Sequence, residues 1–148
     1  VTHPEKIFVG INSNPGTRPG CYIQGNGGIY IGNYVQFASN IGIISANHDI
    51  YDQTKHNERK VVIRDYCWIG QGAIILPGVE LGPRTIVGAG AVVTKSFPEG
   101  FCVVAGNPAK KINDIEKGSV ILPNKSSEYY GFIPKEKFKL KVNEDSNN

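Results

Sequence analysis

The chain has 148 residues and a mass of 16.1 kDa, which suits one domain with a hydrophobic core and is too small for two ordinary domains. It contains 18 Ile and 13 Val but only 4 Leu and 7 Ala, which excludes a helical bundle because β-branched side chains favour strands. The apolar content of 40% excludes a wholly disordered chain. The net charge of +3 comes without a basic run interleaved with aromatic residues, so we expect no binding to nucleic acid.

The three cysteines, Cys21, Cys67 and Cys102, are odd in number and show no CxxC spacing. This pattern predicts neither a disulfide framework nor a zinc knuckle, and a cytoplasmic location fits it best. No apolar stretch reaches the roughly 18 residues of a membrane span, and no signal-peptide core follows Val1. Because the chain contains no Met, we expect the natural protein to begin upstream of Val1.

Apolar residues recur at every sixth position in two series. These are Ile31, Phe37 and Ile43, and then Ile63, Ile69, Ile75, Leu81, Val87 and Val93. A unit of six residues holds one short strand and a turn and cannot bury its own apolar side, so equivalent strands of successive coils must pair. The period therefore predicts an all-β solenoid with parallel strands. The alternative, a sandwich of short strands, does not keep a fixed six-residue phase.

The two series are out of phase, which indicates an insertion between them. The apolar period is absent from residues 47 to about 60, which read NHDIYDQTKHNERK. Solenoids carry such insertions as loops on one face, and these loops often hold functional residues. We therefore predict one extruded loop at about 47–60.

The six-residue period ends at Asn113, so we predict a solenoid domain over residues 1–113 and a C-terminal extension over residues 114–148. Any short helix in this part is expected near Pro108 to Lys117. The extension carries apolar side chains that we expect to dock on the prism or on a neighbouring subunit, namely Tyr129, Tyr130, Phe132, Ile133 and Phe138.

Four motifs follow one another between residues 22 and 112: IGNYV, SANHD, the long segment CWIGQGAIILPGVELGPRTIVGAGAVVTKSFPEG, and AGNPAKKI. In this order they resemble the hexapeptide-repeat acyltransferases, and most of all the sugar and polysaccharide O-acetyltransferases. The resemblance implies a left-handed parallel β-helix with three flat sheets. It also implies a homotrimer with active sites between subunits and acetyl-CoA as the acetyl donor.

His48 lies in the SANHD motif, where the repeat gives way to the loop. Acetyl transfer to a hydroxyl requires removal of the hydroxyl proton, which a neutral imidazole performs well near neutral pH. The resemblance implies that His48 is the catalytic base, whereas His3 and His56 are expected to be surface or local structural residues. Asp49 and Asp52 are two candidates for the group that orients the His48 ring.

The resemblance also implies a set of residues for acetyl-CoA: Trp68, Gly70, Gln71, Ala89, Thr94, Lys95 and Lys110, with Lys111 as the alternative to Lys110. Trp68 could equally join two subunits, and the glycines are also what tight turns require. For the acceptor, the amides of Gln24 and Asn26 are candidates, although the GNGG string around Asn26 also reads as a turn. We expect no metal site.

These observations predict a cytoplasmic acetyl-CoA-dependent O-acetyltransferase that modifies a sugar, such as a precursor of a surface polysaccharide. Direct transfer is expected, because no base stands near Cys67 or Cys102 in the sequence to support an acyl-enzyme. The alternatives are a serine or amino-sugar acetyltransferase of the same fold, a γ-carbonic-anhydrase-like metalloenzyme and a non-catalytic β-helix scaffold. The metalloenzyme is disfavoured because it needs three suitably spaced histidines.

Overall fold

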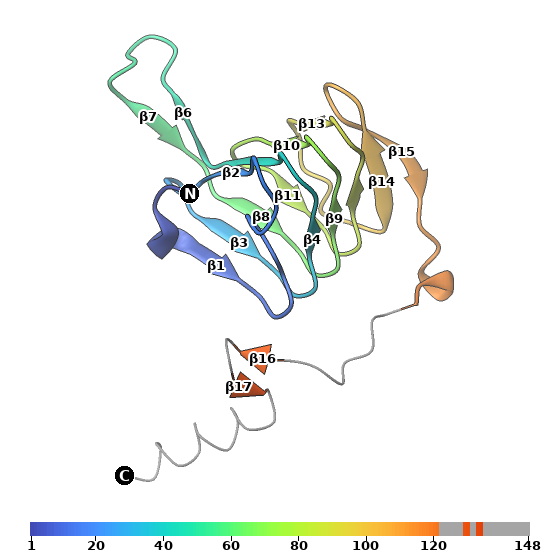
Figure 1. Cartoon of the computed structure of the whole chain (residues 1–148). Helices are drawn as coiled ribbons and strands as arrows, with labels where there is room; N and C mark the ends of the chain where they lie inside the picture. Colours follow the sequence, from blue (N-terminus) through green and yellow to red (C-terminus); the bar gives the residue numbers. More distant parts are fainter. Residues whose placement is uncertain (122–128, 131–132, 135–148) are drawn as a thin grey trace.

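The computed structural model describes residues 1–121, 129–130 and 133–134, and Figure 1 shows the main part of the chain as a prism of stacked coils. Three parallel sheets form its sides. The first contains β1 (Ile7–Val9), β3 (Ile29–Ile31), β8 (Val61–Ile63) and β11 (Glu80–Leu81). The second contains β2 (Tyr22–Gln24), β5 (Gly42–Ile44), β10 (Ile74–Ile75) and β13 (Val92–Val93). The third contains β4 (Gln36–Phe37), β9 (Trp68–Ile69), β12 (Ile86–Val87) and β14 (Cys102–Ala105), and β15 (Lys110–Asp114) is added antiparallel at its end.

The residues of the six-residue period fill the interior of the prism, and each is at least 96% buried. Ile63 pairs with Leu81, which is 18 positions later, so one regular coil takes three six-residue units. Ile31 pairs with Ile63, which is 32 positions later, because that coil also contains the insertion. The chain is a left-handed parallel β-helix, which confirms the predicted fold class and excludes the sandwich.

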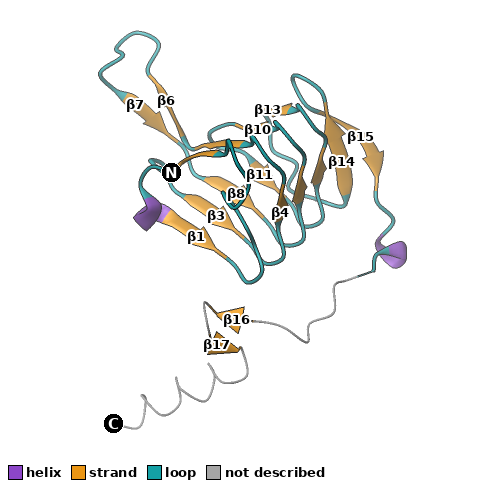
Figure 2. Cartoon of the chain, viewed as in Figure 1, coloured by secondary structure: helices purple, strands orange, loops and turns teal. Residues whose placement is uncertain are grey.

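The insertion forms a β-hairpin rather than an irregular loop. Strands β6 (Ala46–His48) and β7 (His56–Glu58) pair antiparallel, and Figure 2 shows the hairpin projecting from the prism. Pairing along the hairpin satisfies backbone groups that a solvent-exposed loop would leave to water. The extruded loop expected of the fold is thus confirmed, with strand structure inside it.

The region around Pro108 differs from the expectation. No helix spans Pro108 to Lys117; instead β15 covers the free edge of β14, and a single 3₁₀ turn, η2, follows at Lys117–Ser119. The last coil of a β-helix leaves a row of unpaired backbone groups, and an added strand satisfies them where a helix would not. The other 3₁₀ turn, η1 (Pro4–Lys6), precedes β1.

Two short strands, β16 (Tyr129–Tyr130) and β17 (Ile133–Pro134), pair antiparallel in the C-terminal extension. Phe132 and Phe138, which we expected to dock on the prism, lie outside the described residues. The division of the chain at residue 113 stays a prediction. Among the described residues, no helix is both long and apolar enough to cross a membrane.

Candidate functional site

The predicted site residues fall on two separate edges of the prism. The edge between the second and first sheets, from which the hairpin projects, is called here the hairpin corner; it carries Gln24, Asn26, His48, Thr94 and Lys95. The edge between the third and second sheets is called the cleft corner. It carries Gly70, Gln71, Ala89 and Lys110, with Trp68 on the adjoining sheet. The fold therefore divides the predicted residues into two sets that one chain does not bring together.

The base of the hairpin is anchored to the prism through Ser45, which is fully buried. Its hydroxyl donates to the Gln24 carbonyl at 2.7 Å and accepts the Gly27 N–H at 2.9 Å. The side-chain oxygen of Gln24 accepts the Ala46 N–H at 3.0 Å. Gln24 therefore has a structural function at the hairpin base, and its predicted role in acceptor binding stays a prediction, as does that of Asn26.

The hairpin turn is held by its own carboxylates. Asp49 accepts the N–H groups of Tyr51 and Asp52 at 2.9 and 3.1 Å and the side-chain amide of Asn57 at 3.1 Å. These hydrogen bonds, that of the Tyr51 N–H first, lower the pKa of Asp49 below its ordinary value. The pKa of Asp52 is lowered in the same way by the Thr54 hydroxyl and by Lys55.

His48 lies on β6 opposite His56 of β7, with the two ring centroids 4.4 Å apart. Its Nδ1 is 2.9 Å from the backbone oxygen of Gln53. A carbonyl only accepts, so Nδ1 carries the proton in this contact and Nε2 is the basic nitrogen of the neutral ring. The group that orients His48 is thus a main-chain carbonyl. The candidates Asp49 and Asp52 were wrong, because their oxygens are taken by the turn.

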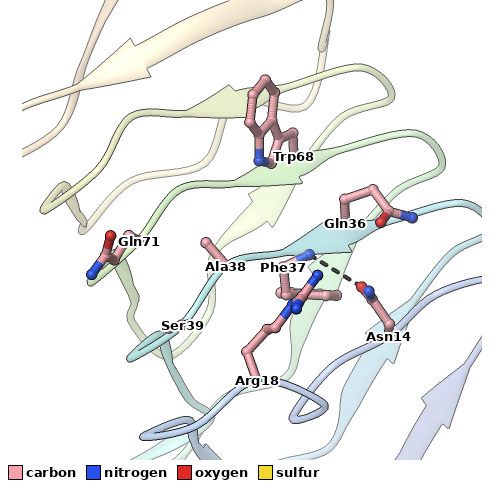
Figure 3. Close-up of a pocket in the computed structure, with 8 residues that line it drawn as sticks. All are labelled: Asn14, Arg18, Gln36, Phe37, Ala38, Ser39, Trp68 and Gln71. Carbon is pink, nitrogen blue, oxygen red and sulfur yellow. Dashed lines mark hydrogen bonds between the residues drawn. The ribbon is translucent and has the colours of Figure 1, made fainter.

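Trp68 is 57% exposed and stands on the outer face of the third sheet, where the Cα pairing places it between Gln36 of β4 and Ile86 of β12. It forms one side of a cleft of about 480 Å³ (Figure 3). Eight residues line this cleft: Asn14, Arg18, Gln36, Phe37, Ala38, Ser39, Trp68 and Gln71. Of the predicted site residues, the structure brings only Trp68 and Gln71 together here, and His48 is not part of the lining.

Sequence reasoning missed Asn14, Arg18, Gln36 and Ser39. Asn14 and Arg18 belong to the segment between β1 and β2, which precedes the regular six-residue series and so offered no phase by which to place it. The available signal was an arginine between two prolines in the string NPGTRPG, a type of segment that forms a rigid turn. That string did not reveal which sheet the turn would cross.

A strip with little side-chain cover runs along the cleft corner. Gly72 and Gly90 lie one coil apart there, and a Cβ on Gly90 would meet nothing within 4 Å. Gly70 is different, because a Cβ at this position would lie 2.6 Å from the Ala89 backbone nitrogen. Stacking of the coils therefore requires a glycine at position 70, whether or not it also contacts a ligand.

The two candidate lysines near the last coil differ in their partners. Lys111 forms an ion pair with Asp114 at 2.7 Å, and the hydrogen bond to that carboxylate raises the pKa of Lys111. Lys110 is exposed and forms no ion pair with any residue in the described part of the chain. Of the two, Lys110 has the charge that is free to meet an external anion.

The cysteines near the repeat are poor nucleophiles. Cys67 is buried and donates to the Gly82 carbonyl at 3.2 Å, and burial raises the pKa of its thiol to about 12. Burial also raises the pKa of Cys102. A thiol reacts through its thiolate, so neither side chain is suited to carry an acyl group at neutral pH.

Within the described ranges, no three side chains of His, Cys, Asp or Glu gather as a group that could hold a metal ion. Nothing in this part of the chain therefore favours the alternative of a γ-carbonic-anhydrase-like metalloenzyme.

Comparison with known proteins agrees with the fold. The family model described as bacterial transferase hexapeptide (six repeats) matches residues 60–95. The galactoside O-acetyltransferase of Lactococcus lactis is 39% identical over 93 residues, which cover 58% of this chain and 44% of that protein. The chain thus spans less than half the length of this curated relative.

Two solved structures show the same architecture. A maltose O-acetyltransferase from Clostridium difficile superimposes with a TM-score of 0.57 at 32% identity, covering 76% of this chain and 68% of that one. A hexapeptide-repeat acetyltransferase from Vibrio cholerae, solved with acetyl coenzyme A, gives a TM-score of 0.66 at 23% identity, covering 76% and 62%. The second likeness establishes the fold alone.

Proposed function

Because the chain belongs to the hexapeptide-repeat acyltransferases, we propose that it transfers an acetyl group from acetyl-CoA to a hydroxyl group of a sugar. The named activities of its relatives from Lactococcus lactis and Clostridium difficile, on galactosides and maltose, support a sugar acceptor and an oxygen nucleophile. We further propose that the sugar is a precursor of a surface polysaccharide and that the reaction takes place in the cytoplasm. The three free cysteines are consistent with that compartment.

In the proposed reaction, Nε2 of His48 removes the proton of the acceptor hydroxyl while the hydroxyl oxygen attacks the carbonyl carbon of the acetyl thioester. The carbon–sulfur bond then breaks, and the imidazolium returns the proton to the departing CoA thiolate. The Nδ1 contact with the Gln53 carbonyl is the observation that carries this assignment, because it leaves Nε2 as the basic atom. The raised pKa of Cys67 supports direct transfer without an acyl-enzyme.

The donor would lie along the cleft corner. The exposed strip at Gly72 and Gly90 suits a thin, extended chain such as the pantetheine arm, which can then contact the main chain. Lys110 lies at the last coil, and its charge has no ion-pair partner among the residues that the structure describes, so it would face a phosphate of CoA. Thr94 and Lys95 lie on the hairpin corner, so in this proposal they contact the donor from a second subunit.

We propose that the active protein is a homotrimer in which the hairpin of one subunit reaches the cleft of the next. The separation of His48 from the Trp68 cleft supports this assembly, since one chain holds the base and the binding surface on different corners. Ile50 and Tyr51 at the hairpin tip are 82% and 92% exposed, as expected of side chains that another subunit would cover.

A complementation experiment tests the shared site. His48→Ala removes the base and leaves the cleft, whereas Trp68→Ala alters the cleft and leaves the base. Each variant alone should have little acetyltransferase activity with a panel of sugars, amino sugars and free serine. Random mixed trimers should recover about a quarter of wild-type turnover, because one neighbour then supplies an intact base and the other an intact cleft.

Mixed trimers without recovered activity would contradict the shared site, as would wild-type turnover in Trp68→Ala alone. Preferential acetylation of serine or of an amino sugar in the same panel would replace the proposed acceptor class. Protein that does not bind CoA in a titration would contradict the enzymatic proposal and favour a non-catalytic scaffold.

A further inference from the structure

We propose that the acceptor sugar carries a fixed negative charge, a carboxylate or a phosphate, and that Arg18 binds this charge in the cleft. The inference rests on the proposed function, because it names the class of sugar that the acetyltransferase modifies. Arg18 supplies the only formal charge among the eight residues that line the cleft, and no acidic side chain is among them.

Arg18 is exposed and forms no ion pair or side-chain hydrogen bond with any described residue. Two of the other three arginines have side-chain partners: Arg64 binds Glu80 through two nitrogens at 3.0 and 2.8 Å, and Arg84 donates to the Ile121 carbonyl at 2.8 Å. A guanidinium has five donors in a planar fork that matches a carboxylate or phosphate. In Arg18 this fork is available to a ligand.

The loop that carries Arg18 is fastened to the prism on both sides of this residue. The Asn14 side-chain oxygen accepts the Phe37 N–H at 3.2 Å, the interaction drawn in Figure 3. On the other side, the Pro19 carbonyl accepts the Asn40 N–H at 3.0 Å. Pro19 also restricts the backbone of Arg18 to extended conformations. The backbone that carries the Arg18 side chain is therefore held in place before a ligand arrives, which lowers the conformational entropy lost on binding.

Figure 3 shows the Arg18 side chain extending over β4, with its guanidinium between Asn14 and Ala38. Trp68 stands on the neighbouring strand and offers an exposed aromatic ring, a surface suited to the apolar face of a sugar. The side chains of Ser39 and Gln71 form no hydrogen bond within the described part of the chain and can meet sugar hydroxyls. The cleft thus combines a cation, a ring and free polar groups.

The phosphates of CoA are the other negative charges that Arg18 could bind. The geometry of the cleft corner favours the acceptor as the ligand of Arg18. Along the cleft corner, Ser39, Gly72, Gly90 and Gly106 follow one another on successive coils, which spans about 14 Å at the usual strand spacing. Lys110 lies at the far end of this strip. A donor with its phosphates at Lys110 would bring its thioester toward the cleft, which leaves Arg18 for the acceptor.

Binding can be tested without turnover, because Trp68 is the only tryptophan in the chain and reports on the cleft by fluorescence. Methyl glucuronide and methyl glucoside form one pair of probes, and glucose 6-phosphate and glucose form another. We expect the charged member of each pair to bind more tightly. Arg18→Gln should weaken binding of the charged members by about 10- to 100-fold and leave the neutral ones within about twofold.

The control is Arg64→Gln, which removes the same charge from the first sheet, where Arg64 pairs with Glu80. It should leave all four affinities unchanged, and a matching loss there would mean that net charge alone is responsible. Arg18→Lys keeps the charge without the fork and should retain part of the preference. Equal affinities for charged and neutral probes in the wild type would overturn the proposal.

The donor is tested with CoA and pantetheine. If Arg18→Gln weakens the binding of CoA but not that of pantetheine, Arg18 binds a phosphate of the donor and the proposal fails. Acetyl transfer with no preference for charged acceptors would likewise contradict the anion site and leave the proposed function intact. Tight, Arg18-dependent binding of the charged sugars without acetyl transfer to any acceptor would contradict the proposed function and leave the anion site standing.

Discussion

The hairpin corner and the cleft corner are stabilised in different ways. The hairpin turn is built from hydrogen bonds between residues close in sequence, such as those between Asp49 and the Tyr51 and Asp52 N–H groups. The cleft is built from residues distant in sequence, since Asn14, Gln36 and Trp68 meet only because their coils stack. His48, the proposed base, is therefore on an appendage that projects from the prism, and the proposed binding surface is on the prism itself.

The largest expected effect separates chemistry from binding. His48→Ala should lower kcat by about 10²- to 10⁴-fold, because the acceptor hydroxyl loses its base. The thermal midpoint and the affinity for CoA should stay nearly unchanged, because the side chain is exposed and is not part of the cleft lining. Steady-state kinetics, thermal melting and a CoA titration measure these three quantities.

The comparison variant for this prediction is His56→Ala, which removes the ring beside His48 and leaves the Gln53 contact. We expect a far smaller loss of kcat from it. Turnover unchanged in His48→Ala would exclude this residue from the mechanism.

A smaller effect is expected at the loop that carries Arg18. Gly20 has a φ of +73°, and a Cβ there would collide with the Asn40 side chain. Gly20→Ala should destabilise the protein by about 1–2 kcal/mol, through backbone strain and displacement of Asn40. It should also weaken the binding of charged sugars in the cleft. Urea unfolding and the Trp68 fluorescence titration measure both effects.

Gly16→Ala is the matched control. Gly16 has a similar φ of +76°, but a Cβ there would meet only Ile23 Cδ1 at an ordinary 3.5 Å. The Gly16→Ala variant should be destabilised by the backbone strain and should bind charged sugars as tightly as the wild type. Equal loss of binding in both variants would mean that general loosening of the loop, rather than its fastening at Asn40, controls the cleft.

The smallest effect is a pH dependence confined to the hairpin. The lowered pKa of Asp49 means that its hydrogen bonds stabilise the turn fully above the ordinary value near 3.8. This contribution is lost as the pH falls through the lower pKa of the folded state. Amide exchange at Tyr51 and Asp52 should therefore accelerate in acid before that of the prism strands.

Asp49→Asn provides the check, because it should remove most of this acid-induced change at the Tyr51 and Asp52 amides. If the prism strands and the hairpin lose protection at the same pH in the wild type, the two regions are not independently stabilised.

The sequence predicted the hairpin corner better than the cleft corner. The position of His48 at the start of the insertion was identifiable, because a regular period stops there and such a break is visible along the chain. Its role as a base stays a prediction. The Gln53 carbonyl that orients it could not be identified, because any main-chain carbonyl of the turn could have filled that position. Arg18 and Asn14 could not be assigned to the cleft, because no period connects their segment to β4.

The sequence by itself determined that the chain forms a prism, since aliphatic side chains at a six-residue spacing are buried only when successive coils stack. It also determined where that stack is interrupted. Only the tertiary structure decided which side chains share an edge: it placed Arg18 and Trp68 in the lining of one cleft and put His48 on another corner. The reason is physical. Which side chains are buried within a coil follows from the local six-residue pattern, whereas which side chains of different coils lie close together depends on the number of residues in each turn and insertion.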